Sequence, residues 1–254
     1  MKYGICVNVK SIEMAMEAGF DFVEVPLQPL AAMSEEEFLQ VVALSEKYPD
    51  RLLCANWMFP GEIRLTGPDM NEETIRQHCR HAYARLARLG VKTLVFGSGW
   101  AKRVPEGFSF DEAMDQLERA VRIMGEEAKP HGQAVVIEPL RRQETNIIYT
   151  VADSADLADR SGMDNVYPHA DFFHFSQNEE TLEGGLRPYA KRLIHVHLAS
   201  PVERTAPTPE DGADYRAFFD VLREEGFDGT ASYEGKALET VDEMRALLAY
   251  MRTM

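Results

Sequence analysis

The feature that most constrains this chain is a repeated alternation of short, β-branched apolar runs with longer amphipathic stretches. The apolar runs predict strands, and the stretches between them carry apolar residues at helical spacing. Strands that alternate with helices form parallel βαβ units, because a parallel connection needs a crossover of a dozen or more residues. The sequence therefore predicts an α/β protein with a parallel sheet.

The expected strands and helices can be placed along the whole chain. The strands are expected at 3–7, 22–25, 52–55, 93–96, 134–137, 167–170, 193–196 and 230–233. The helices are expected at 11–18, from 34 onward, and at 72–89, 110–128, 154–160, 180–186, 215–225 and 241–251. Eight strand-then-helix units in about 250 residues are typical of a closed (β/α)₈ TIM barrel. We therefore expect residues 1–254 to form a single TIM-barrel domain.

A doubly wound open sheet is the alternative architecture for the same pattern. Such a sheet usually carries a GxGxxG turn after its first strand. Here that turn reads Asn8-Val9-Lys10 and contains no glycine. The closed barrel is the better interpretation.

The net charge and the cysteine content limit which partners and which cellular compartment we expect for the protein. The chain has 42 acidic and 27 basic side chains and a net charge of −15. Such a surface repels polyanions, which argues against nucleic acid and anionic membranes as partners. Three scattered cysteines without a CxxC pair do not form a disulfide framework. With no long apolar stretch that predicts a signal or a membrane span, we expect a cytoplasmic protein.

Acids and imidazoles stand at the carboxyl ends of the last four expected strands, where barrel enzymes keep their chemistry. Glu138, Asp171 and Glu234 end the fifth, sixth and eighth strands. His195 and His197 alternate on the seventh and so share one side of it. A lone strand-end Glu is usually solvated or ion-paired, and a lone buried His is usually hydrogen-bonded. Three carboxylates buried together, however, would cost many kcal/mol or force protonation unless a cation neutralises them.

The predicted site is therefore a centre for one divalent cation, with Glu138, Asp171, His197 and Glu234 as ligands. Oxygen and imidazole donors suit Mn²⁺, Mg²⁺ or Co²⁺ better than a thiolate-type zinc site does.

Four sequence motifs resemble one known family. Residues 138–146 read EPLRRQETN and are similar to the E-P-L-N-R-x-E-T-N stretch of the ketose 3-epimerases. Residues 171–174 resemble its D-x-x-H, 195–197 its H-x-H and 232–234 its S-x-E. The chain thus resembles the xylose-isomerase-like TIM-barrel sugar isomerases and epimerases, and most of all the D-tagatose 3-epimerase-like members.

The resemblance implies roles for particular residues. The positions that match the family's metal ligands are Glu138, Asp171, His197 and Glu234, with Mn²⁺ as the first expectation and Mg²⁺, Co²⁺ or Zn²⁺ as alternatives. The positions that match its sugar contacts are Glu144, His174 and Arg204. Three departures concern the substrate: Arg204 lies one residue further from His197 than expected, Ala199-Ser200 replace the usual acidic residue after H-x-H, and Arg141 stands where Asn is common.

The implied reaction is epimerisation of a ketose at C3 through a cis-enediolate. Glu138 and Glu234 would act as base and acid on opposite faces of the carbon. His195, one inward position deeper than His197, is expected to hydrogen-bond behind the ligands. The expected partner is a small-molecule sugar, and the family suggests a homo-oligomer, either a dimer or a tetramer.

Three alternatives remain open at this stage. One is another metal-dependent lyase or isomerase of the same superfamily, such as an inosose dehydratase or an enzyme that cleaves 3-keto-glycosides. A second is an apurinic-site endonuclease, which would need extra histidines at the third and fourth strand ends, where Asn56 and Gly97 stand instead. The third is a non-catalytic sugar-binding barrel.

A few other residues have both a functional and a structural interpretation. Glu24 ends the second expected strand and is either a substrate contact or an ion-pair partner. Trp57 and Trp100 are either an aromatic wall for a sugar or packing under loops. Lys102 and Arg103 are either a phosphate grip or ordinary loop charges.

Overall fold

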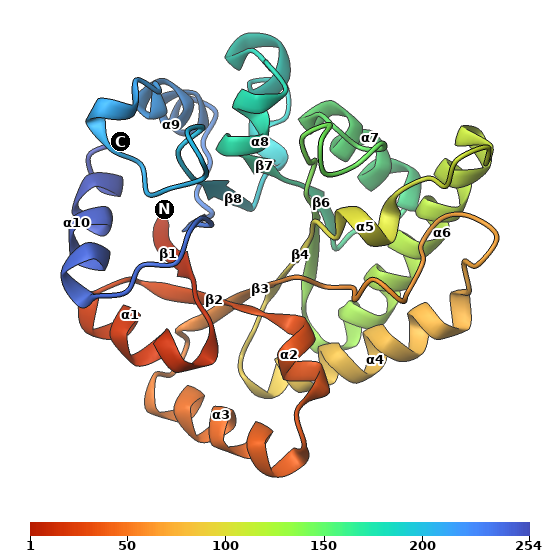
Figure 1. The fold of residues 1–254 in the computed structure, drawn as a ribbon, viewed down its shortest axis with the longest axis horizontal. Helices are drawn as coiled ribbons and strands as arrows, with labels where there is room; N and C mark the ends of the chain where they lie inside the picture. Colours follow the sequence, from red (N-terminus) through yellow and green to blue (C-terminus); the bar gives the residue numbers. More distant parts are fainter.

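A computed structural model describes residues 1–254 and shows a parallel sheet that curves into a barrel, with helices around its outside (Figure 1). Every strand pair is parallel, in the order β6-β5-β4-β3-β2-β1-β9-β8-β7. The strands are β1 (Lys2–Cys6), β2 (Phe22–Pro26), β3 (Leu52–Asn56), β4 (Thr93–Phe96), β5 (Ala134–Ile137), β6 (Val166–Pro168), β7 (Ala170–Asp171), β8 (His195–Leu198) and β9 (Thr230–Tyr233).

The two ends of this strand order are halves of one strand. Only His169 separates β6 from β7; β6 pairs with β5, and β7 pairs with β8. Pro168, which has no N–H to donate to a ladder, stands at the break. Counted as one interrupted strand, β6 and β7 close an eight-stranded barrel, and the predicted TIM-barrel fold is confirmed.

The helices follow the strands in the expected rhythm. They are α1 (Ile12–Ala18), α2 (Leu27–Ala32), α3 (Glu35–Lys47), α4 (Glu72–Arg88), α5 (Gly99–Lys102), α6 (Phe110–Ala128), α7 (Val151–Ser161), α8 (Phe172–Gln177), α9 (Tyr215–Glu224) and α10 (Val241–Met251). Capping boxes at Ser34 and Thr150 begin α3 and α7. Gly19 and Gly162, both with positive φ, end α1 and α7.

The structure differs from the sequence-based expectations in four places. Helices α2 and α5 were not expected, because they are too short to show a helical period. In the range expected for the sixth helix, 180–186, the structure has a helical turn at Leu182–Leu186, but it is π-helical, and the unexpected α8 precedes it. The seventh strand lies at His195–Leu198 rather than 193–196.

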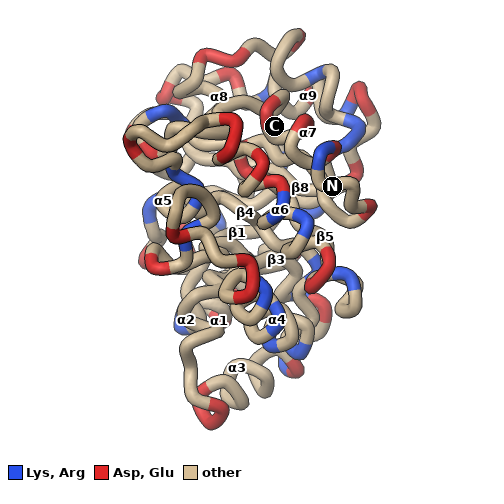
Figure 2. Tube along the Cα trace, turned by 90° about the vertical axis from the view of Figure 1, so that its right-hand side faces the viewer, with Lys and Arg blue, Asp and Glu red and all other residues tan.

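The apolar core fills the space between the strands and the surrounding helices, and α6 alone contributes seven residues to it. The charged residues gather on the helices and loops, with acidic and basic side chains interspersed (Figure 2). No helix is both long and apolar enough to span a bilayer.

Candidate active site

Four predicted ligands converge at the carboxyl ends of neighbouring strands. Glu138 directly follows β5, Asp171 ends β7, His197 lies in β8 and Glu234 directly follows β9. One ligand atom from each of the four lies within 4.8 Å of the others. Glu138, Asp171 and His197 are buried, and Glu234 is mostly buried.

The backbone around the first two carboxylates fixes their positions. The Glu138 N–H donates to the Phe96 carbonyl of β4 at 3.0 Å. Gly97 leaves room for the side chain, because a Cβ there would overlap Glu138 Oε2. Asp171 caps α8, accepting a hydrogen bond of 2.6 Å from the Phe173 N–H. That bond uses Oδ1 and leaves Oδ2 facing the cluster.

His197 sits between the two catalytic candidates and a third glutamate. Its Nδ1 lies 3.3 Å from Glu138 Oε1 and 3.2 Å from Glu234 Oε2. Its Nε2 lies 3.0 Å from Oε1 of the fully buried Glu24. A metal-binding histidine commonly donates its other ring N–H to a carboxylate, and Glu24 is placed to accept it.

Electrostatic interactions in the cluster give Glu138 and Glu234 very different pKa values. Burial and the nearby Glu234 carboxylate raise the pKa of Glu138 to about 7. Burial also acts to raise the pKa of Glu234, but His197 and Arg204 outweigh it and lower that pKa to about 2. Burial lowers the pKa of His197, yet Glu24 and Glu234 raise it well above its ordinary value. The carboxylates of the cluster thus carry more negative charge than the His197 imidazole and the Arg204 guanidinium balance. The cluster therefore binds either a proton or a metal cation.

The donor set fits a divalent cation. Three carboxylates and one imidazole supply the hard oxygen and borderline nitrogen ligands that such ions prefer. Beside them, His174 Nε2 is buried without a hydrogen-bond partner, 4.0 Å from Glu138 Oε1 and 3.8 Å from Asp171 Oδ2. Its pKa is lowered, chiefly by burial, so the ring is neutral. Because its Nδ1 accepts a hydrogen bond of 3.1 Å from the Arg141 N–H, Nε2 carries the ring proton and can donate it to an oxygen in the site.

A cavity of about 330 Å³ opens directly over this cluster and is large enough for a small molecule. Glu144, His174 and Arg204, the predicted sugar contacts, all line it. So do Trp57 and Trp100, whose side chains are largely exposed, as the aromatic-wall interpretation expected.

Arg204 has more contacts than the prediction gave it. Its Nη2 lies 3.3 Å from Asp171 Oδ2 and also pairs with Glu234 Oε2. Its Nε donates to the Glu234 carbonyl at 3.1 Å. Arg204 therefore contacts two predicted metal ligands, where its charge would compete with a cation. Glu144 accepts a hydrogen bond of 2.7 Å from Arg141, the residue that departs from the family motif.

Lys102 does not point into the cavity. It is fully buried, and its Nζ donates to the Glu138 carbonyl at 2.8 Å. Burial lowers its pKa to about 7. Neither Lys102 nor Arg103 lines the cavity, so the phosphate interpretation is wrong, and Lys102 instead supports the backbone of Glu138.

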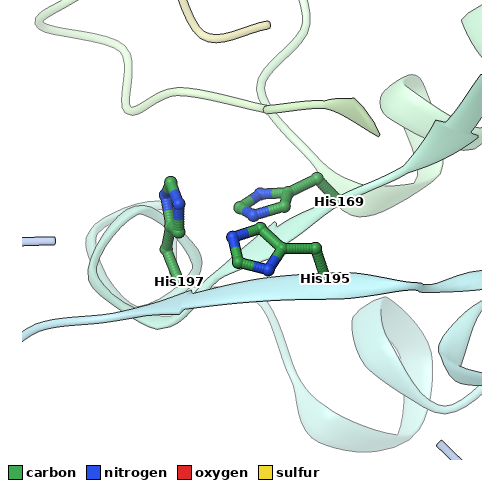
Figure 3. A group of neighbouring side chains, drawn as sticks. All are labelled: His169, His195 and His197. Carbon is green, nitrogen blue, oxygen red and sulfur yellow. The ribbon is translucent and has the colours of Figure 1, made fainter. Parts of the chain in front are cut away.

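The barrel interior beneath the cluster holds more polar side chains than His195, the one that the sequence analysis expected there. His195 Nε2 lies 3.0 Å from Glu24 Oε2, and its Nδ1 lies 2.7 Å from the Thr230 hydroxyl. His169, from the break between β6 and β7, packs against both histidines of β8 (Figure 3). One feature of the sequence pointed to Glu24: it is a charged residue inside a strand, between Val23 and Val25, and both of these neighbours are buried.

The comparison with known families decides the membership of the chain. Residues 12–254 match the model described as "Xylose isomerase-like TIM barrel". The chain belongs to this family. The resemblance of its motifs to sugar isomerases and epimerases is thereby confirmed.

Curated relatives of this family member are epimerases and isomerases. The 3-dehydro-D-guloside 4-epimerase of Escherichia coli K12 is 27% identical over 251 residues, which cover 93% of this chain and 91% of that protein. The 2-oxo-tetronate isomerase of Haemophilus influenzae is 27% identical over 237 residues, covering 88% and 86%. These relatives support the prediction of an enzyme of the isomerase class.

Solved structures share the fold over the whole chain. The apo 3-keto-D-glucoside 4-epimerase from E. coli has a TM-score of 0.82 at 23% identity and covers 100% of both chains. The D-psicose 3-epimerase of Clostridium cellulolyticum H10, solved with D-tagatose, has a TM-score of 0.86 at 19% identity and covers 100% of this chain and 99% of that one. At these identities the likeness concerns the fold.

Proposed function

We propose that this chain is a divalent-metal-dependent sugar epimerase that inverts the carbon next to a ketone. The observation that carries the proposal is the convergence of Glu138, Asp171, His197 and Glu234 within 4.8 Å beneath a cavity of small-molecule size. In a free ketose the inverted carbon is C3. A cation at the cluster, Mn²⁺ by family resemblance, would polarise the carbonyl and make the neighbouring C–H acidic.

The side chains supply the proton transfers. One of Glu138 and Glu234 takes the proton from carbon, which gives a cis-enediolate, and the other returns a proton to the opposite face. Two carboxylates are needed because a single base would return the proton to the face it left. Such general acid–base catalysis typically contributes about 10²–10⁴-fold.

The remaining residues bind and orient the sugar. Glu144 and His174 line the cavity within reach of hydroxyl groups, and Arg204 is placed to hold a further oxygen once it leaves the carboxylates. Glu24 orients His197 from behind. Trp57 and Trp100 offer apolar faces to the sugar ring.

Epimerisation next to the ketone of a 3-keto-glycoside is the second candidate. It is favoured by the similarity to 3-dehydro-D-guloside 4-epimerase over almost the whole of both chains. The chemistry is the same, since the inverted carbon again carries a hydroxyl and adjoins a ketone.

Hydrogen–deuterium exchange tests the proposal. With Mn²⁺ in D₂O, the wild-type protein should exchange one carbon-bound hydrogen of a ketose or 3-keto-glycoside and yield the epimer. Glu138→Gln and Glu234→Gln should each lower that rate by about 10² or more. Unchanged exchange in both variants would contradict the two-base mechanism.

A further inference from the structure

A second cavity, of about 350 Å³, lies beside the sugar cavity. It shares three lining residues with the first: Asn56, Trp57 and Glu234. We call this second cavity the apolar annex. It is bounded by β1 and the segment that follows it, by the end of β2 and the start of α2, by the end of β3, and by β9 and the loop that follows it. Its apolar walls include Ile5, Val7, Pro26, Pro29 and Leu238.

The annex and the sugar cavity differ in chemistry. Five side chains in the sugar cavity are charged or carry an imidazole: Glu138, Glu144, His174, Arg204 and Glu234. In the annex only Glu234 is charged, and it stands at the junction. The annex therefore lacks the charged hydrogen-bonding groups that hold a ring of hydroxyls, and its walls favour an apolar group.

The two cavities meet at a proposed catalytic group. Asn56 Nδ2 donates to Glu234 Oε1 at 3.0 Å and lies 3.5 Å from Cys6 Sγ in the annex. Trp57, which lines both cavities, is 61% exposed and has a φ of 52°. Because Glu234 lines both cavities, a ligand whose reacting carbon lies at Glu234 borders on the annex as well as on the sugar cavity.

We propose that the apolar annex binds the aglycone of the substrate, so that the preferred substrate class is a keto-glycoside with an apolar aromatic or alkyl aglycone. The inference rests on the proposed function, because the annex is placed relative to the carbon that reacts at Glu234. A free monosaccharide would occupy the sugar cavity and leave water against the walls of the annex. An attached apolar group would displace that water and add binding energy in proportion to the apolar area it covers.

The reaction balances without a further reactant. A carbon-bound proton beside the ketone passes to one glutamate, and a proton returns to the opposite face of the same carbon from the other. The glycosidic bond stays intact, and no group is oxidised or reduced overall. The aglycone contributes binding and orientation only.

Two matched substrates test the inference: the methyl and the p-nitrophenyl 3-keto-glucosides, compared by hydrogen–deuterium exchange with Mn²⁺. We expect kcat/KM for the aryl glycoside to exceed that for the methyl glycoside roughly tenfold or more, the range typical of apolar pocket contacts. Equal values in the wild-type protein would overturn the inference.

Substitutions in the annex test whether the preference for the aryl glycoside arises there. Ala237→Trp fills the annex from an exposed position, and Leu238→Ser removes an apolar wall. Both should bring the aryl-to-methyl ratio to about one while the methyl glycoside reacts within about twofold of wild type. Leu39→Ser, an exposed leucine on α3 that lines neither cavity, is the control and should keep the wild-type ratio.

The outcomes separate this inference from the proposed function. Exchange with both glycosides at a ratio that Ala237→Trp and Leu238→Ser leave unchanged would overturn the aglycone site and leave the epimerase proposal in place. Exchange with free ketoses and none with glycosides would do the same. A complete lack of exchange with any ketose or keto-glycoside would overturn both.

Discussion

Glu24 is fully buried inside the barrel and contacts two imidazole rings. Its carboxylate oxygens lie 3.0 Å from His195 Nε2 and 3.0 Å from His197 Nε2. Burial raises the pKa of Glu24, but the two histidines outweigh this and lower it well below its ordinary value. The ionised carboxylate therefore holds the His197 Nε2–H toward itself and leaves Nδ1 free for a cation.

Removing this charge should weaken metal binding. Glu24→Gln is expected to lower the affinity for Mn²⁺ about 10–100-fold, the usual effect of losing a carboxylate behind a ligating histidine. Titration of Mn²⁺ into metal-free protein, followed by calorimetry, measures it directly. Glu36→Gln, at an exposed position on α3, is the control. Equal affinity in wild type and Glu24→Gln would show that Glu24 does not orient His197.

The sequence allowed the four predicted ligands to be chosen but not this glutamate's role. Glu138, Asp171, His197 and Glu234 stand at strand ends, and in a barrel every such end points to the same rim. Glu24 lies within β2, where its partners are set by the barrel's curvature. His195 and His197 are more than 170 positions away along the chain. Strand periodicity carries no information about such a contact.

At the scale of elements, the interrupted strand places an unusual side chain in the core. His169, between β6 and β7, is fully buried, and neither of its ring nitrogens has a hydrogen-bond partner. Burial and the neighbouring His197 and His195 lower its pKa well below the ordinary value, so the ring is neutral. His195 is equally buried, but both of its nitrogens have partners, Thr230 and Glu24.

Substitution by leucine should have different effects on the free energy of unfolding at these two histidines. His169→Leu is expected to leave the free energy of unfolding unchanged or to raise it, because it removes unpaired polar atoms and keeps a similar volume. His195→Leu should lower it by about 1–3 kcal/mol, because Glu24 and Thr230 lose a partner. Denaturant unfolding of both variants measures this. A His169→Leu variant as destabilised as His195→Leu would mean that the ring nitrogens do bind a group in solution.

The start of α7 carries a pH-sensitive contact. The Val151 N–H donates to Glu180 Oε2 at 3.1 Å, and the other oxygen of Glu180 is buried without a partner. Burial raises the pKa of Glu180 to about 7. In an unfolded chain a glutamate titrates near ~4.3. Between these values the folded state holds the proton more tightly, so stability falls as the pH rises toward the folded-state value.

Replacing the Glu180 carboxyl by an amide should remove this loss of stability with rising pH. Glu180→Gln keeps an acceptor for Val151 but has no proton to lose, so its Tm should exceed that of wild type at pH 8 by more than at pH 5. Glu179→Gln, at the exposed neighbouring position, should show no such pH dependence. Thermal unfolding at both pH values measures the difference, and a pH-independent gain in Glu180→Gln would contradict the assigned pKa.

The elements themselves were largely predictable from the sequence. Strands such as Ala134–Ile137 are short apolar runs that are mostly buried, and α6 repeats its apolar positions over five turns, so both patterns are clear. The two-residue β7 and the four-residue α5 are too short for any period to appear. Their positions depend on pairing and loop packing, which only the folded chain defines.

For the molecule as a whole, closure of the barrel brings side chains that are far apart in the sequence together in one site. The four ligands come from consecutive parts of the last half of the chain, and Glu24 reaches them from the first half because β1 joins β2 to β9. The family motifs identified this rim, but they could not reveal the apolar annex. Its walls come from β1 and the segment after it, from the β2–α2 junction, from the end of β3 and from the loop after β9, and these residues show no shared pattern.

The central claim is that one cation binds among these four side chains, and anomalous diffraction from crystals of the Mn²⁺-loaded protein tests it most directly. We predict a single strong peak within the coordination distance of divalent ions, about 2.0–2.6 Å, from carboxylate oxygens of Glu138, Asp171 and Glu234 and from His197 Nδ1. The Arg204 guanidinium should have moved off Asp171 and Glu234. A peak elsewhere, or none at saturating Mn²⁺, would contradict the account.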